Sequence, residues 1–176
     1  MEKILELLES YNCLFESEEL IKKRFLDFVQ KNEDCFERYL ETGHITASAF
    51  IFDKEYNKIL LLHHKKLNKW LQPGGHCDGD KDTLSVAIKE VFEETGLVIE
   101  NQAQPIFDLD IHTIPENKGI PEHEHFDVRY LLLADSKLPL VQNHETNQLK
   151  WVDLSEMENY TTEQSLKRMK NKLELV

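Results

Sequence analysis

Three glutamates, Glu90, Glu93 and Glu94, are spaced so that they could bind a divalent cation together. Residues three and four positions apart lie on the same side of an α-helix, so these carboxylates would repel one another without a cation. Carboxylate oxygens are ligands that suit Mg²⁺ or Mn²⁺. An acidic helix face in solvent would show the same spacing, so a metal site needs a second signal.

A glycine-rich loop before the glutamates supplies that signal. Gly74 and Gly75 allow the backbone to approach a ligand closely, and the carbonyl of Gly75 would add one more oxygen ligand. An apolar stripe at helical spacing predicts a helix over residues 83–95 that packs on the core, and Gly96 ends that helix. The stripe consists of Leu84, Ala87, Ile88 and Val91.

The segment from Gly75 to Leu97 resembles the Nudix box, the signature of the Nudix hydrolase family. The positions that agree with the box are Gly75, Glu90, Val91, Glu93, Glu94, Gly96 and Leu97. The resemblance implies an α/β protein, a Nudix-like α/β/α sandwich with a mixed sheet. It also implies hydrolysis of a phosphoanhydride bond in a nucleoside diphosphate linked to another moiety. The implied metal is Mg²⁺ (or Mn²⁺), bound by Gly75, Glu90, Glu93 and Glu94.

Two lysines depart from the box. Lys81 stands where the family has its first glutamate, and Lys89 stands where it has an arginine. In the family these two residues form an ion pair that braces loop and helix, and two lysines cannot form it because both are cationic. Lysine also lacks the planar, bidentate group of arginine. Two alternatives follow: Asp80 or Asp82 pairs with Lys89, or Lys81 faces the substrate phosphates. The intact glutamates favour altered bracing over lost chemistry.

The two lysines also motivate a second hypothesis, a catalytically weak Nudix domain that binds and senses a nucleotide. Binding without turnover would distinguish this sensor from a hydrolase. A third hypothesis is an isomerase with the fold of isopentenyl diphosphate isomerase. It is less favoured because the hydrolytic box is largely complete.

Hydrolysis at such a site needs a further carboxylate as general base or extra ligand. Glu145 is the preferred residue, because it precedes a predicted strand in a loop where members of the family often carry an acid. Asp127 is the second choice. The predicted catalytic set is therefore Glu90, Glu93, Glu94 and Glu145.

Histidines form the second unusual feature of the sequence. His123, His125 and Asp127 alternate along the chain, so they would share one face of a strand and could hold a metal or a phosphate. Polar residues in a loop before a strand would look the same. Together with Asp110 and His112, this stretch resembles that of one Nudix subgroup. The predicted substrate contacts are His76, Lys81, His123 and His125, with His76 expected nearer to substrate than His44 or His63.

Hydrophobic periodicity predicts the order of the elements and two segments of chain. Residues 1–41 are expected to form an N-terminal extension of two or three helices, and residues 42–176 the Nudix hydrolase domain. Strands are predicted at 46–52, 59–62, 106–114, 128–134 and 149–152, an extended segment at 97–99, and a closing helix at 165–173. A polar loop is expected over 115–125.

Composition narrows the class of partner. The net charge of −12 and the pI of about 5.1 disfavour long nucleic acids, so a small nucleotide or diphosphate is the expected substrate. The three cysteines have no CxxC spacing, which argues against disulfides and against a zinc site made of cysteines. Cys77 is expected to be a small apolar residue of the loop and not a nucleophile. No signal peptide or membrane-spanning run is evident, so a cytoplasmic protein is expected. The sequence leaves monomer and homodimer open.

Overall fold

The structure is a computed structural model that describes residues 1–100, 102–117 and 119–175. Lys118, within the predicted loop 115–125, lies outside the described residues. The helices are α1 (Glu2–Ser10), α2 (Glu16–Lys31), α3 (Thr83–Thr95) and α4 (Gln164–Leu173), with one 3₁₀ helix, η1 (Leu154–Asn159). The strands are β1 (Gly43–Asp53), β2 (Lys58–His64), β3 (Lys69–Leu71), β4 (Gly74–His76), β5 (Asp108–Ile114), β6 (His123–Leu133) and β7 (Thr146–Asp153).

These strands form one mixed sheet whose path is β3-β2-β1-β6-β5, with β4 paired to β1 and β7 paired to β2. The long strand β1 is buried throughout and lies parallel to β6, while its other pairings are antiparallel. β1 carries two partners on its second side: β4 pairs with Thr46–Ser48, and β2 pairs with Phe52–Asp53. This division leaves β4 beside the middle of β1, where α3 also packs.

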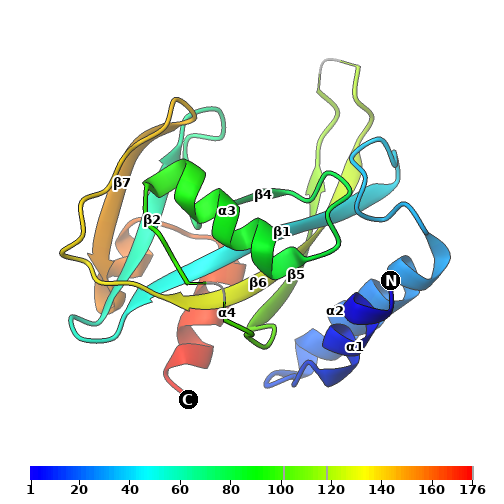
Figure 1. Ribbon diagram of the computed structural model, residues 1–176, viewed down its shortest axis with the longest axis horizontal. Helices are drawn as coiled ribbons and strands as arrows, with labels where there is room; N and C mark the ends of the chain where they lie inside the picture. Colours follow the sequence, from blue (N-terminus) through cyan, green and yellow to red (C-terminus); the bar gives the residue numbers. More distant parts are fainter. Residues whose placement is uncertain (101, 118, 176) are drawn as a thin grey trace.

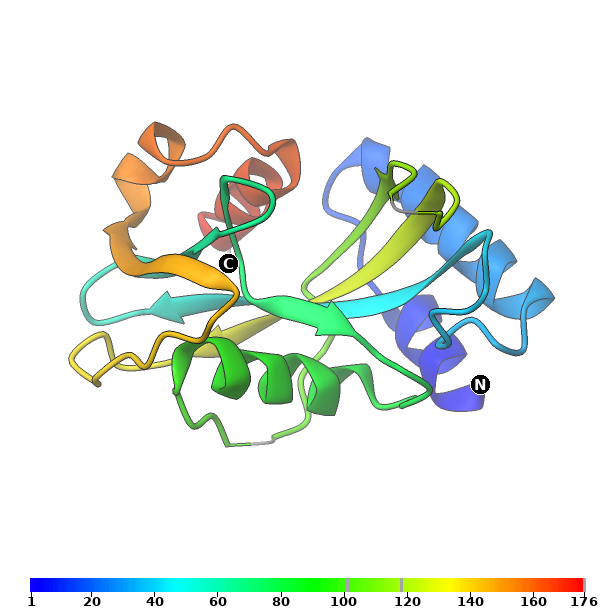
Figure 2. The same ribbon diagram turned by 90° about the horizontal axis from the view of Figure 1, so that it is seen from above.

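Helices cover both faces of the sheet. Figure 2 shows α3, in green, on one side and α4, in red, on the other, whereas α1 and α2 lie at the end that carries β5 and β6. The alternation of side chains along β1 explains the two layers. Ile45, Ala47, Ala49 and Ile51 join the core under α1–α3, and Phe50 and Phe52 join the core with α4.

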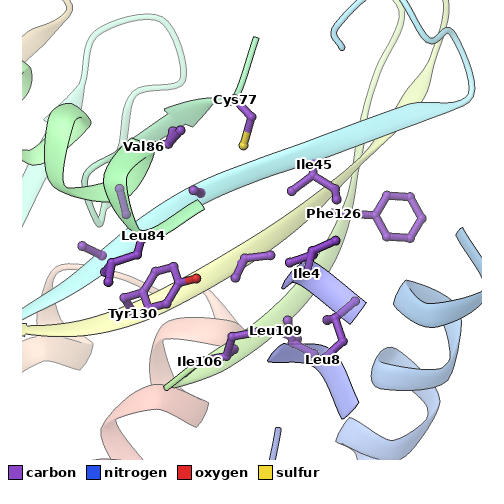
Figure 3. Packing of buried hydrophobic residues seen from close by; sticks show 14 of the residues in the cluster. Ile4, Leu8, Ile45, Cys77, Leu84, Val86, Ile106, Leu109, Phe126 and Tyr130 are labelled. Carbon is purple, nitrogen blue, oxygen red and sulfur yellow. The ribbon is translucent and has the colours of Figure 1, made fainter. Parts of the chain in front are cut away.

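The larger core ties the N-terminal helices to the sheet. Ile4 and Leu8 of α1 lie in the same apolar cluster as Ile45 of β1 and Leu109 of β5 (Figure 3). The ring of Phe126 in β6 stacks on Phe28 of α2, with ring centroids 3.9 Å apart. The N-terminal helices therefore share a core with the sheet that carries the predicted site.

Most predicted elements are present, and the α/β fold with N-terminal helices is confirmed. Helix 83–95 forms as predicted, and the left-handed φ of 75° at Gly96 ends it. Three predictions were wrong in detail. Residues 97–99 form no strand, β6 begins at His123 inside the expected loop, and the short strands β3 and β4 were missed.

No helix among the described residues combines the length and apolar character needed to cross a membrane.

Candidate active site

Helix α3 presents its glutamates because its opposite side is fixed to the core. Leu84, Ala87 and Val91 are buried, as the apolar stripe predicted. The side chain of Asp82 caps the start of the helix by accepting a bond from the N–H of Ser85. This anchoring buries Glu94, which is 6 % exposed, and leaves 49 % of the Glu93 side chain exposed.

Strand β4 lies directly against two of the three carboxylates. A Cβ atom on Gly75 would come within 2.6 Å of the carboxylate carbon of Glu90, so any larger residue would push that carboxylate away. The N–H of Gly74 donates a hydrogen bond to Oε2 of Glu94 at 3.0 Å. The two glycines thus bring backbone and carboxylates together, and the set of hard oxygen donors fits a Mg²⁺ or Mn²⁺ ion.

Replacing Gly75 with alanine tests this close approach. We expect Gly75→Ala to displace the Glu90 carboxylate and to lower kcat by about 10²-fold, since misplacement by about 1 Å has effects of this size. Gly119→Ala is the control for backbone strain alone, because φ there is 85° while a Cβ atom would meet no atom within 4 Å. Steady-state kinetics of both variants give the comparison. Equal loss in both variants would contradict the role of Gly75.

The carboxylates are electrostatically frustrated without a cation. Burial, together with the charges of Glu90 and Glu145, raises the pKa of Glu94 to about 8, although the bond from Gly74 partly opposes the shift. Burial also raises the pKa of Glu90. The Nζ atom of Lys89 lies 3.7 Å from Glu90 and 3.5 Å from Glu93, which offsets part of the negative charge. A divalent cation would offset the remainder.

The raised pKa of Glu94 predicts that metal affinity depends on pH. Below pH 8 a Mg²⁺ ion must displace a proton from Glu94, so we expect affinity to rise by up to about tenfold per pH unit between pH 6 and 8. Above that range the rise should level off. Isothermal titration calorimetry at pH 6, 7, 8 and 9 measures it, and a flat profile would show that Glu94 is ionised throughout.

The same shift affects the stability of the metal-free protein. A carboxyl whose pKa rises on folding from 4.5 to about 8 binds its proton more tightly in the folded state. Its stabilising contribution is therefore complete below pH 4.5 and is lost as pH rises toward 8. Glu94→Gln should remove this component of the pH dependence in urea unfolding.

Glu145 lies in the loop before β7 and faces the same cluster. Its charge raises the pKa of both Glu90 and Glu94, and 46 % of its side chain is exposed. Asp127, the second choice, is buried and accepts hydrogen bonds from Thr46, Ser48 and Arg129. Glu145 is therefore the fourth acid that acts on the glutamates of α3.

The two lysines of the box lie in different surroundings. The suggestion that Asp80 or Asp82 pairs with Lys89 was wrong, because Lys89 contacts Glu90 and Glu93 of its own helix. Asp82 pairs instead with Lys3 at 2.7 Å, while its other oxygen caps α3. Lys81 is exposed at the N-terminal end of α3, the end opposite Glu94. Lys89 is thus a cation in direct contact with two of the three glutamates of α3.

Cys77 and His76 directly follow the two glycines of β4 and were both considered as functional residues. Burial raises the pKa of the Cys77 thiol far above its ordinary value, which keeps the thiol protonated, as expected for a structural cysteine. His76 follows Gly75 and lies on the opposite face of β4, where its ring is 5.0 Å from that of His44. His44 was expected to be more remote than His76. The closeness of His44 to His76 was not predicted, because it depends on the antiparallel pairing of β1 with β4.

Comparisons with known proteins show which proteins this chain is similar to. A probable DHNTP pyrophosphohydrolase from Lactococcus lactis is 33 % identical over 90 residues, which is 50 % of this chain and 52 % of that protein. The chain thus spans about half the length of this curated relative.

Two solved structures are also similar. A Nudix-family hydrolase from Clostridium perfringens has 27 % identity and a TM-score of 0.55, with 75 % of this chain and 97 % of that chain covered. The MutT protein from Methanosarcina mazei Go1 has the same fold, with 17 % identity and a TM-score of 0.61 over 75 % and 93 % of the two chains.

A family model described as the NUDIX domain matches residues 42–173, a range that includes β4, α3 and Glu145. The match covers most of the chain and includes the site in which two glycines lie against the glutamates of α3. The protein therefore belongs to the Nudix family.

Proposed function

We propose that this protein is a metal-dependent Nudix hydrolase that cleaves a phosphoanhydride bond in a nucleoside diphosphate linked to another moiety. The packing of Gly74 and Gly75 against Glu90 and Glu94 is the observation that carries the proposal. This packing supports a cation site made of residues of the family signature. The similarity to a probable pyrophosphohydrolase supports the same class of reaction.

Each site residue has a distinct proposed role. Glu90, Glu93 and Glu94 hold Mg²⁺ or Mn²⁺ together with the carbonyl of Gly75. When bound, the metal supplies Lewis-acid stabilisation of the negative charge on the diphosphate and favours ionisation of water. Lys89 restrains Glu90 and Glu93 from the solvent side. His76 is the proposed contact to the substrate, whereas Lys81, at the end of α3 opposite Glu94, has no proposed role in binding it.

Glu145 is the proposed general base that takes a proton from the attacking water. We expect Glu145→Gln to lower kcat by about 10²- to 10⁴-fold, the usual contribution of a positioned base, with a smaller effect on Mg²⁺ affinity. The acidic limb of the profile of kcat against pH should disappear with the base. Glu122→Gln, a change at an exposed residue, is the control. An unaltered pH profile in Glu145→Gln would assign the base elsewhere.

A panel of substrates tests the proposed activity. It includes nucleoside triphosphates, dinucleoside polyphosphates, nucleotide sugars, ADP-ribose and NADH, each with Mg²⁺ and with Mn²⁺. We expect at least one diphosphate-linked compound to yield nucleoside monophosphate as a product. Binding without product release throughout the panel would instead favour a nucleotide sensor.

A further inference from the structure

Five histidine rings, those of His44, His76, His112, His123 and His125, lie together on one face of the sheet. The pairing of strands brings them together: β1 places His44 opposite His125 of β6, and β5 places His112 opposite the same residue. The ring of His125 has its centroid 4.8 Å from His44, 5.0 Å from His76 and 5.3 Å from both His112 and His123. Apart from His76, these imidazoles have no assigned part in the proposed hydrolysis.

Three of these rings point ligand atoms at a common volume. One ring nitrogen each from His44, His123 and His125 lies within 4.8 Å of the other two. In a tetrahedral site with Zn–N bonds of about 2.0–2.1 Å, the nitrogens would lie about 3.3 Å apart. Shifts of about 1 Å in side chains on two adjacent strands would therefore bring all three onto one ion.

The buried nitrogens lack ordinary partners. Within the described part of the chain, neither ring nitrogen of His44, which is 3 % exposed, makes a hydrogen bond of normal geometry, and Nε2 of His125 makes none either. A buried polar atom without a partner costs about 1–3 kcal/mol. Two adjacent residues with such atoms, both directed at the same volume, indicate that something other than protein completes their bonding.

The outer surroundings of the rings are those of metal-bound histidines. Nδ1 of His123 lies 2.9 Å from the carbonyl of Pro121, which orients that ring and leaves Nε2 for a metal. The carbonyl of Leu40 acts on His44 in the same direction, since it favours a protonated ring nitrogen. Backbone carbonyls commonly hold the second nitrogen of a ligating histidine in this way.

Unpartnered ring nitrogens that lie close together favour a metal ion as the occupant of this position. Burial and the neighbouring histidines lower the pKa of His44 to about 4 and that of His125 still further. Neutral imidazoles bind metals through their free nitrogens, whereas they offer no positive charge to a phosphate.

We propose that His44, His123 and His125 form a second metal site, which takes a transition-metal ion such as Zn²⁺ rather than Mg²⁺. Imidazole nitrogen suits Zn²⁺, Ni²⁺ and Cu²⁺, and Mg²⁺ prefers oxygen, so the ligands separate this site from the glutamates. His76 is the nearest candidate for a fourth ligand, and water is the alternative. The bound ion would lie on the face of β4 opposite Gly75.

Metal titration of the whole protein tests this second site. Protein stripped with a chelator is titrated with Zn²⁺ by calorimetry in the presence of excess Mg²⁺, and with Co²⁺ by visible absorption. We expect one equivalent of Zn²⁺ to bind, and Co²⁺ to give the intense absorption bands of a tetrahedral site. His123→Ala and His125→Ala should each weaken Zn²⁺ binding at least about 100-fold, since even indirect changes cost up to that much.

Two controls separate this site from the others. His144→Ala removes a histidine whose side chain is 91 % exposed and should leave the titration unchanged. Glu90→Gln with Glu94→Gln should also retain the Zn²⁺ site, because it alters only the glutamate cluster. Because His123 is only half-buried, we expect His123→Ala to fold like the wild type, and circular dichroism checks that it does.

Three results of the Zn²⁺ titration would overturn the second site. They are no Zn²⁺ binding by the wild type, full Zn²⁺ binding by a folded His123→Ala variant, and loss of the Zn²⁺ equivalent in the double glutamine variant. Binding of inorganic phosphate in place of Zn²⁺ would likewise assign the cluster to anions. None of these results depends on finding the substrate.

Discussion

Replacing Glu90 or Glu94 with glutamine is expected to lower kcat by about 10²- to 10³-fold, the effect of losing one preorganised electrostatic contact. Glutamine keeps the size of the side chain but removes the negative charge. At position 94 it also keeps an oxygen that can accept the bond from Gly74. The loss should therefore reflect metal binding more than misfolding, and a rise in Mg²⁺ concentration should recover part of the rate.

Two comparisons make the result interpretable. Glu33→Gln removes the same charge from an exposed position before the sheet and should keep wild-type kinetics. The double variant Glu90→Gln with Glu94→Gln should lose far less than the product of the single losses, because the residues act on the same ion. Near-normal turnover in both single variants would reject these glutamates as metal ligands.

Replacing Lys172 with methionine is expected to destabilise the fold by about 3–5 kcal/mol, since it leaves buried charges unpaired. Lys172 is 1 % exposed and forms ion pairs with Glu18 of α2 and with Asp108 of β5, the latter at 2.7 Å. Its Nζ also donates to the hydroxyl of Tyr11 at 2.6 Å. One cation thus links the N-terminal helices, the sheet and α4.

Urea unfolding measures this prediction. Lys167→Met is the matched control, because Lys167 lies on the same helix and pairs at 3.4 Å with Glu158, with side chains that are 31 % and 52 % exposed. Such a surface pair contributes about 0–1 kcal/mol. A loss below about 1 kcal/mol in Lys172→Met would mean that Arg168, which also contacts Asp108, holds the network without the lysine.

Patterns among residues close in sequence predicted helix α3 well. The spacing of Glu90, Glu93 and Glu94, the apolar stripe and the stop at Gly96 all depend on residues close in sequence. The helix that they define formed with the expected bounds, Thr83–Thr95. The register of Gly75 relative to Glu90 could be anticipated because the box fixes both ends of a short loop.

Non-local pairing explains what was missed. β4 consists of Gly74, Gly75 and His76, a sequence with little preference for strand, and it is a strand because it pairs with β1. The polar start of β6 was predicted as loop, yet its pairing with β1 and β5 makes it a strand from His123 onward. The contact between His44 and His125 depends on that parallel register, which a single sequence does not reveal.

Turnover in ¹⁸O-labelled water with Mg²⁺ tests phosphoanhydride hydrolysis most directly. The substrate panel is incubated with the wild type and with Glu94→Gln, and the products are analysed by mass spectrometry. For at least one diphosphate-linked nucleotide, one ¹⁸O atom should appear on a phosphate of one product. This incorporation should require Mg²⁺ and should fall sharply in Glu94→Gln. Nucleotide binding without any labelled product across the panel would contradict a hydrolase and would identify a nucleotide-binding Nudix domain.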